Sequence, residues 1–323
     1  MRRLSLLDRA LDASVLLSFD RNGFRRHAKR FIASDLDVDL RGRRIAVTGA
    51  NSGIGKATAL GLAERGAEVW MLCRSKERGE AALSEVRSAS GNDDVHLLLV
   101  DVSDFGSIRA ACAKLADAPL HGLVHNAGVL PSERRVTPDG HELTLATNLL
   151  GPFLMTWLLL PALRSAGASR LLWVTSGGMY PTRLSMNDFQ HEKPPFDGVQ
   201  AYSRTKRAQV VLTEQLAERL NDSGVVVHAM HPGWADTPAV ASSIPTFHKV
   251  TKAILRTPAE GADTLLWLAV ADSPMDSSGK LWFDRRAVAT HYLPTTRARD
   301  EVRQALWDEI CQLVDVDPKA PLP

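Results

Sequence analysis

The sequence contains little cysteine: three residues in 323, Cys73, Cys112 and Cys311, with no two in a CxxC pair. This spacing argues against a disulfide framework and a metal site, and it indicates reduced thiols in a cytoplasmic-type compartment. The chain also lacks an excess of charge, since its formal net charge is +2, which argues against a general nucleic-acid binder. There is no internal repeat and no low-complexity segment. With 45% hydrophobic and 24% charged residues, the composition predicts a soluble globular protein with a full core.

Membrane signals are scarce as well. The opening, MRRLSLLDRALD, is basic, but Asp8 and Arg9 interrupt its apolar run too early for a signal peptide. The stretch from Leu143 to Leu163 carries no charge and is long enough to span a bilayer. Asn148, two prolines and the strand-like segments on both sides favour instead a helix buried in a large core or a subunit interface.

From Arg44 onward, short apolar runs alternate with helical patterns. Near-continuous hydrophobic runs predict strands covered on both faces, and the alternation predicts an α/β fold, a doubly wound parallel sheet with helices on both faces. Such sheets bind ligands beyond the carboxyl ends of their strands. The predicted strands are RIAVTGA, EVWMLCR, VHLLLVD, GLVHNAG, RLLWVTS, VVVHAMHPG and KLWFD; the predicted helices are Ile54–Arg65, Lys76–Ser88, Phe105–Ala116, His141–Arg164, Ala201–Asn221 and Ala259–Ala269.

Two segments flank the α/β domain, which we place at residues 43–290. Residues 1–42 form a basic, amphipathic amino-terminal arm, and residues 291–323 form a tail with one predicted helix, Thr296–Val314. Two interpretations of the arm stay open: it packs on the body or on a partner subunit, or it is a helix on a membrane surface. Its apolar positions fall in two stripes, Leu4, Leu7, Leu11 and Val15, and then Phe24, Ala28 and Phe31.

The segment VTGANSGIGKATAL joins a strand end, a glycine-rich turn and a helix start, the context in which glycines predict a phosphate site. Gly49, Gly53 and Gly55 are spaced GxxxGxG. Gly49 allows a tight turn after the strand, Gly53 allows backbone to approach a pyrophosphate, and Gly55 permits close helix–strand packing. The amino end of the helix offers free N–H groups and a positive dipole to the phosphates.

The end of the second predicted strand indicates which dinucleotide binds. An acidic residue at this place would hydrogen-bond the ribose 2′-hydroxyl of NAD. The sequence has none there: Cys73 fills the place and Arg74 follows. Arginine can hold a 2′-phosphate with its planar fork of donors. The sequence therefore predicts NADP(H), against the alternative that Arg74 is a solvated residue at a helix start.

The segment VQAYSRTKRAQVVL places Tyr202 four residues before Lys206, so the two side chains share one helix face. A positive charge favours the phenolate and lowers a tyrosine pKa from its usual value of about 10. Such a pair can exchange protons near neutral pH. The pair alone is equally typical of a solvated helix face, so the other motifs decide its meaning.

The glycine turn is followed by four further motifs in a fixed order: HNAG at His125–Gly128, TNLLG at Thr147–Gly151, VTS and YxxxK. With this ordered set, the chain resembles the short-chain dehydrogenase/reductase family. The resemblance covers about Arg43 to Asp284. It implies a single Rossmann-type domain with a sheet of seven parallel strands. It also implies an oxidoreductase that uses a nicotinamide cofactor.

By position, the resemblance assigns the catalytic roles to Asn148, Ser176, Tyr202 and Lys206. It implies that Ser176 hydrogen-bonds the substrate carbonyl oxygen and that Tyr202 donates a proton to it. Lys206 lowers the tyrosine pKa and contacts the nicotinamide ribose, while Asn148 bends its helix and holds a water. His125 departs from the family's commoner asparagine, which bears on sheet stabilisation and not on chemistry. The implied cofactor-binding residues are Gly49, Asn51, Ser52, Gly53, Ile54, Gly55, Arg74, Asp101, Val102, Asn126, Ala127, Gly128, Tyr202, Lys206, Pro232, Gly233 and Thr237.

Further segments resemble one subgroup of this family. TSGGM, PFDG, HPGWADTP and GADTLLWLA look like the subgroup called SDR family member 12 in animals, with wider kinship to retinol-dehydrogenase-like members. That kinship implies NADPH-dependent reduction of a lipophilic carbonyl, or oxidation of the matching alcohol, and some of these relatives associate with membranes. We expect residues 177–201 and 238–258 to overhang the reactive end of the cofactor. Apolar side chains in and beside these segments either line a pocket or pack within the loops. They are Met179, Tyr180, Trp234, Ile244 and Phe247.

Alternatives remain on function and assembly. A regulatory protein that binds NADP(H) without turnover would keep the glycine turn, but such proteins usually lack the tyrosine or lysine. A nucleotide-sugar epimerase or dehydratase would need a second, sugar-binding domain. Helices His141–Arg164 and Ala201–Asn221 form a homodimer interface in many relatives; the amino-terminal arm capping that surface would leave a monomer.

Overall fold

The computed structural model describes residues 11–12, 15–237, 249 and 251–323 of the chain. Among these residues, eight strands form one sheet in the order β3-β2-β1-β4-β5-β6-β7-β8. Four residues of the sequence predictions, Leu4, Leu7, Ile244 and Phe247, lie outside the described part. The strands are β1 (Arg44–Thr48), β2 (Glu68–Cys73), β3 (Val95–Leu99), β4 (Gly122–His125), β5 (Ser169–Val174), β6 (Val225–Met230), β7 (Lys280–Phe283) and β8 (Arg286–Val288).

The first seven strands run parallel, as the sequence predicts, and β8 is an addition. It pairs antiparallel with β7, so the prediction of a purely seven-stranded sheet is incomplete. The turn between them, Asp284–Arg285, has both φ angles positive, 47° and 55°. No glycine or asparagine marks this turn, and three residues are too few for a readable alternation.

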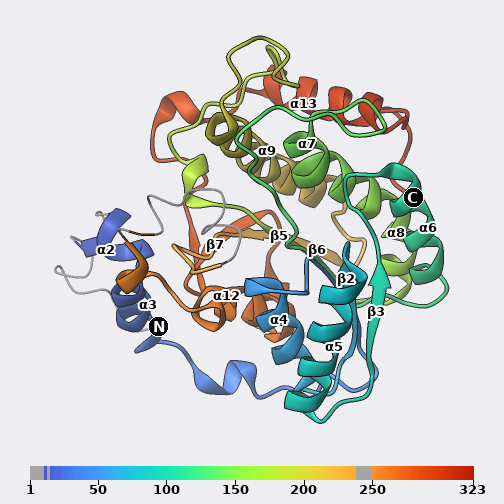
Figure 1. Ribbon diagram of the computed structural model, residues 1–323, viewed down its shortest axis with the longest axis vertical. Coiled ribbons are helices and arrows are strands. Elements are labelled where there is room, and N and C mark those ends of the chain that lie inside the picture. Colours follow the sequence, from blue (N-terminus) through green and yellow to red (C-terminus); the bar gives the residue numbers. More distant parts are fainter. Residues whose placement is uncertain (1–10, 13–14, 238–248, 250) are drawn as a thin grey trace.

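Helices cover both faces of the sheet (Figure 1). One buried apolar cluster joins α4, α5 and α12 to the sheet, and a second joins α6, α8 and α9 to the opposite face. The central strands β1, β4, β5 and β6 are buried on both sides, which explains their near-continuous apolar runs, whereas the edge strand β3 ends in the exposed Leu99. The helices are α2 (Val15–Phe19), α3 (Arg21–Ala28), α4 (Gly53–Ala63), α5 (Lys76–Ser90), α6 (Phe105–Leu115), α7 (Leu143–Leu145), α8 (Gly151–Ser165), α9 (Gly198–Arg219), α12 (Pro258–Val270) and α13 (Asp300–Leu313), with shorter turns η1 (Ala33–Leu36), η3 (Gly177–Met179), η4 (Lys252–Ile254), η5 (Ser273–Asp276) and η6 (Pro294–Thr296).

The long apolar stretch is a core helix. Among the described residues, one helix, Leu143–Ser165, has the length and composition to cross a membrane. Of its most apolar window, 83% is buried inside the protein. A π-helical segment, η2 (Ala146–Leu150), interrupts it between α7 and α8. Such bulges occur frequently at functional sites, and this one contains Asn148.

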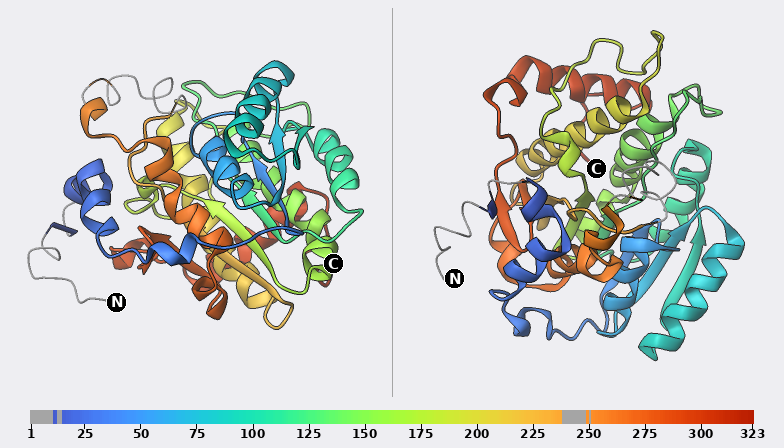
Figure 2. Two further views of the ribbon diagram at one scale, coloured as in Figure 1. Left: turned by 90° about the horizontal axis from the view of Figure 1, so that it is seen from below. Right: turned by 60° about the vertical axis from the view of Figure 1, so that its left-hand side comes forward.

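The carboxy-terminal helix α13 packs across α9, as Figures 1 and 2 show. Trp307 of α13 stands edge-on to Phe153 of α8 with ring centroids 5.5 Å apart, and the Arg219 guanidinium lies 3.8 Å from the Trp307 ring centre. The helix pair suggested as a dimer surface is thus partly covered within the chain. The described part of the amino-terminal arm does not take part in this covering, and the assembly state stays a prediction.

The described part of the arm packs at the other side of the molecule, beside α12 and β7 (Figure 2). Arg21 forms an ion pair with Glu260 of α12 at 3.0 Å. Phe24 and Phe31 contact each other, with ring centroids 5.8 Å apart, and they lie under the guanidinium groups of Arg256 and Arg285 respectively. The second apolar stripe therefore packs on the body of the domain.

Candidate active site

The glycine-rich turn after β1 is built as a tight cradle. Gly49 and Gly53 have positive φ angles of 67° and 55°, a conformation that costs other residues energy. A Cβ on Gly55 would lie 2.4 Å from both the Gly49 carbonyl oxygen and the Asn126 amide nitrogen. That amide donates to the Thr48 carbonyl at 2.9 Å, so Asn126 holds the turn in shape. The close packing predicted for Gly55 is present, against the turn itself.

The amino end of α4 lacks the side-chain cap that several other helices carry. Helices α5, α6, α9 and α12 are each capped by a side chain, those of Ser75, Asp104, Asp197 and Thr257. At α4, Ser52 stands at the capping position without making a cap hydrogen bond. The first N–H groups of α4 thus have no side-chain acceptor there, and the small residues before them leave backbone exposed. This arrangement fits a pyrophosphate.

Arg74 and Asp101 lie together at the carboxyl ends of β2 and β3. The Arg74 side chain is 61% exposed, and its guanidinium is 3.7 Å from the Asp101 carboxylate. Asp101 is held by Ser103, whose hydroxyl and N–H donate to it at 2.7 and 2.9 Å. An exposed arginine whose ion pair is this long can donate hydrogen bonds to a phosphate. Cys73 is buried beside it, and burial raises the pKa of its thiol to about 11.

Asn148 sits in the π-helix and is tied on three sides. Its side chain accepts from Val129 N–H at 2.9 Å, and donates to the Val129 carbonyl at 3.1 Å and to the Thr205 hydroxyl at 3.2 Å. Its backbone carbonyl accepts from Gln209 Nε2 at 2.6 Å. The bend at Asn148 expected from the family resemblance is thus a π-bulge supported from α9.

Ser176, Tyr202 and Lys206 converge at the end of β5. The Ser176 side chain lies close enough to Tyr202 for its hydroxyl to lower the pKa of the phenol, and both side chains are half-buried. Lys206 is buried, with Nζ 5.4 Å from the centre of the Tyr202 ring, and donates to the Val174 carbonyl at 2.8 Å. Gly128 lies beside them, since a Cβ there would be 3.3 Å from Asn148 Oδ1 and 3.6 Å from Lys206 Nζ. The four catalytic candidates therefore share one site.

Burial raises the pKa of Tyr202 above its usual value, and the nearby Ser176 hydroxyl lowers it only in part. Burial also lowers the pKa of Lys206 to about 7, so near neutral pH much of this lysine is uncharged and attracts a phenolate weakly. The lowering of the tyrosine pKa by Lys206 that the family resemblance implies stays a prediction.

This buried lysine predicts a pH-dependent stability. Because its pKa is about 7 in the folded state and about 10.4 in the unfolded chain, the unfolded state binds more protons between these values. The free energy of unfolding should therefore rise with pH in this window, by at most about 1.4 kcal/mol per pH unit from this group. We expect urea denaturation between pH 7 and 8.5 to show the rise in the parent protein. Lys206→Met should lack it; equal slopes in both proteins would contradict the assignment.

The segment after β6 lies opposite this group. Gly233 has a φ of 71°, and a Cβ on it would be 2.5 Å from Arg256 Nε. Pro232 and Thr237 are half-buried on either side of it. A short parallel bridge between Ala235 and Arg256 fixes this stretch. The residues matched to the nicotinamide site thus form a constrained backbone turn.

Several supporting residues escaped the sequence analysis. Thr205 and Gln209 lie three and seven residues after Tyr202, on the face of α9 that carries the catalytic pair, and this spacing was a readable signal. Asp197 caps α9 by accepting from Val199 and Gln200 N–H at 2.9 and 3.0 Å. The helix consequently begins at Gly198, three residues earlier than predicted.

The loop after Ser176 is held by a buried arginine. Arg207 donates to the carbonyls of Met179, Thr182 and Thr290 at 2.9, 3.1 and 2.5 Å. Met179 and Tyr180 are buried in the core, so packing within the loop describes them better than a free pocket lining. Trp234 is partly buried against the same core.

His125, the departure from the family pattern, is a packing residue. Its Nε2 lies 2.8 Å from the Thr156 hydroxyl of α8, and its ring contacts Trp173 with centroids 4.5 Å apart. Burial lowers its pKa to about 3, so it stays neutral. It links β4 to α8 without entering the site.

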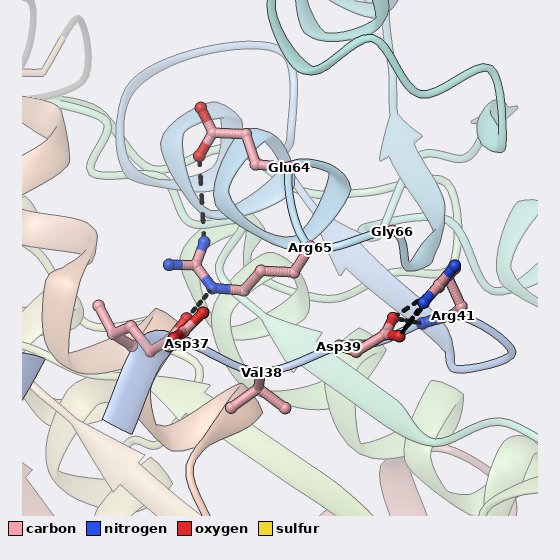
Figure 3. Close-up of a pocket in the computed structure, with 8 residues that line it drawn as sticks. Asp37, Val38, Asp39, Arg41, Glu64, Arg65 and Gly66 are labelled. Carbon is pink, nitrogen blue, oxygen red and sulfur yellow. Dashed lines mark hydrogen bonds and ion pairs between the residues drawn. The ribbon is translucent and has the colours of Figure 1, made fainter. Parts of the chain in front are cut away.

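A surface groove elsewhere on the molecule is unrelated to this site. Residues 36–39, 41 and 64–66 line it (Figure 3). They precede β1 and β2, so the groove lies at the amino ends of these strands, away from the catalytic group. Its charged side chains are satisfied locally: Arg65 donates to the Leu36 carbonyl at 2.6 Å, and Arg41 pairs with Asp39. Within the described residues, no group of three or more His, Cys, Asp or Glu side chains is placed to hold a metal ion.

Comparison with known proteins places the chain in a family. The family model described as short chain dehydrogenase matches residues 43–246. The chain belongs to the short-chain dehydrogenase/reductase family. Human dehydrogenase/reductase SDR family member 12 is 41% identical over 288 residues, covering 88% of this chain and 90% of the relative. Human retinol dehydrogenase 12 is 37% identical and covers 87% and 89% respectively.

Solved structures agree on the fold. An uncharacterized protein from Mycobacterium Paratuberculosis superposes with a TM-score of 0.71 at 26% identity, covering 90% of this chain and 98% of that one. A second chain of this fold, complexed with NADPH, has a TM-score of 0.63 at 24% identity and covers 79% of this chain and 100% of its own length. A third, complexed with NADH, has a TM-score of 0.61 at 24% identity and covers 75% of this chain and 96% of its own length. The chain is therefore an NAD(P)-dependent oxidoreductase of the short-chain type, and its cofactor preference must be argued from its own residues.

Proposed function

We propose that the protein is an NADP(H)-dependent carbonyl reductase acting on a lipophilic ketone or aldehyde, or on the matching alcohol in the reverse direction. The observation that carries the proposal is the convergence of Ser176, Tyr202 and buried Lys206 at the end of β5, on the edge of the sheet that also holds the glycine turn. The retinol dehydrogenases among the relatives, whose names give a lipophilic alcohol as substrate, support a lipophilic substrate here.

The residues fit a dinucleotide at this edge. The Gly49–Gly55 turn and the uncapped start of α4 would hold the pyrophosphate, Arg74 the 2′-phosphate and the Pro232–Gly233 turn the nicotinamide side. The bound cofactor supplies or accepts the hydride at the substrate carbon.

Side chains of the site donate the proton that the substrate oxygen receives. Ser176 donates a hydrogen bond to the carbonyl oxygen, and the Tyr202 hydroxyl transfers its proton to that oxygen as the alcohol forms. The raised pKa of Tyr202 keeps the hydroxyl protonated before reaction. Lys206, which has a pKa near 7, can return a proton to the phenolate. The hydrogen bond between Asn148 and Thr205 ties η2 to α9, the helix that carries both Tyr202 and Lys206.

A panel of aliphatic, aromatic and long-chain carbonyl compounds tests this function. We expect oxidation of NADPH with at least one lipophilic member, followed at 340 nm, and a lower kcat/KM with NADH. Binding of NADPH without consumption across the whole panel would favour the regulatory alternative.

Arg74 provides the test of cofactor choice. Replacing Arg74 with Ala should lower kcat/KM for NADPH by about 10- to 100-fold, because a charge-assisted contact to the 2′-phosphate is worth roughly 1.5–3 kcal/mol. The value for NADH should change by less than about threefold. Arg78→Ala, a matched loss of charge in the first turn of α5, is the control. Equal losses with both cofactors would contradict the assignment.

A further inference from the structure

One side chain of the amino-terminal arm reaches the catalytic edge of the sheet. Phe19, at the end of α2, is only 4% exposed. A Cβ on Gly177, the residue after Ser176, would lie 2.3 Å from Phe19 Cε2, so the ring occupies the space that a side chain at position 177 would need. On its other side the ring packs against His231 and Phe283, with centroids 4.6 and 5.1 Å away.

The backbone around Phe19 contacts the opposite wall of the site. Trp234 N–H donates to the Phe19 carbonyl at 2.8 Å. A Cβ on Gly233 would lie 2.6 Å from that same carbonyl oxygen. The Trp234 ring stands edge-on to the Phe19 ring, with centroids 6.2 Å apart. Phe19 therefore lies between the turn that carries Ser176 and the turn that carries Pro232–Gly233.

A buried ionic cluster holds the arm in this position. Arg256 donates to the carbonyls of Ser18, Phe19 and Asp20 at 2.9, 3.0 and 3.2 Å. The same guanidinium pairs with Asp284 through two contacts of 2.6 and 2.9 Å. His27 Nδ1 of α3 lies 2.5 Å from Oδ2 of that carboxylate. The Phe19 backbone is thus anchored at three consecutive carbonyls.

We propose that Phe19 is a positioning residue for the proposed reaction, on which this inference rests. Its ring and carbonyl set the separation between the Ser176–Gly177 turn and the Pro232–Trp234 turn, and hence the distance from the serine hydroxyl to the nicotinamide side. Misplacement by about 1 Å costs on the order of 10²-fold in rate. An arm that served only stability would act equally through any of its aromatic side chains.

Phe31 offers the matched control. It also packs the arm on the body, where its ring contacts Arg285 and Phe24. Phe19→Ala should lower kcat by about 10- to 100-fold, with the Kd for NADPH changed by less than about threefold. Phe19→Leu should restore most of the rate, and Phe31→Ala should leave kcat close to the parent value. Equal losses in the Phe19 and Phe31 variants, or none with Phe19→Ala, would overturn the proposal.

Hydrogen exchange separates this inference from the function on which it rests. In Phe19→Ala, peptides covering residues 175–182 and 232–237 should exchange faster. Phe19→Leu, which replaces that variant if it does not fold, should show the same change to a smaller extent. Peptides covering 49–56 should be unchanged, and Phe31→Ala should affect only the arm. If no carbonyl is turned over but this pattern appears, the positioning role stands and the reductase proposal fails. A uniform change across the chain, with turnover intact, would reject the positioning role alone.

Discussion

Replacing Tyr202 with Phe is expected to reduce kcat for carbonyl reduction by about 10²–10⁴-fold, the usual contribution of a positioned general acid. The variant keeps the ring, and with it the packing at the start of α9, but it removes the hydroxyl that lies beside Ser176. The Kd for NADPH, from the quenching of protein fluorescence, should change by less than about threefold because the glycine turn and Arg74 are untouched.

The chain supplies its own control, since it has only three tyrosines. Tyr180 lies four residues after Ser176 and is buried, stacked on Tyr292 with centroids 4.2 Å apart. Tyr180→Phe removes a hydroxyl near the site without touching the proposed proton path, so its kcat should remain within about threefold of the parent. Turnover that survived Tyr202→Phe, or that fell equally in both variants, would mean that the proton comes from another group.

Replacing Arg256 with Leu is expected to lower the free energy of unfolding by about 3–5 kcal/mol, the cost of breaking a buried ion pair from one side. Arg256 and Asp284 are each 1% exposed. Burial alone would raise the pKa of Asp284, but the hydrogen bond from His27 and the charge of Arg256 lower it overall. Without the guanidinium, the carboxylate loses its main partner and three backbone carbonyls each lose one donor. The carbonyls of Phe19 and Asp20 keep the backbone N–H groups of Trp234 and Phe24 as donors.

Arg303→Leu is the matched control for this loss. Arg303 pairs with Glu214 and Glu218 on the surface, where those carboxylates are 30% and 63% exposed, so its removal should cost about 1 kcal/mol or less. Urea denaturation of both variants measures the difference. The double variant Arg256→Leu/Asp284→Leu should be less destabilised than the sum of its single variants. Additive losses would show that the two residues stabilise the fold independently.

The same cluster explains the turn that sequence reading missed. Asp284 and Arg285 both adopt positive φ angles, a conformation that is uncommon for residues other than glycine and asparagine. Asp284 is held by Arg256, and Arg285 pairs with Asp263 through contacts of 2.8 and 2.7 Å. These ion pairs come from segments some 20 to 30 residues away, so no local pattern indicates the turn or β8.

The sequence by itself determined the parallel sheet, the glycine turn and the helix carrying Tyr202 and Lys206, because each depends on local periodicity or on residue spacing within one element. The tertiary structure alone decided that Phe19 reaches Gly177, that α13 covers α9, that Gln209 supports the π-bulge at Asn148, and that burial raises the pKa of Tyr202. These features depend on contacts between distant segments and on how much water each group loses. Such quantities arise only when the whole chain has packed.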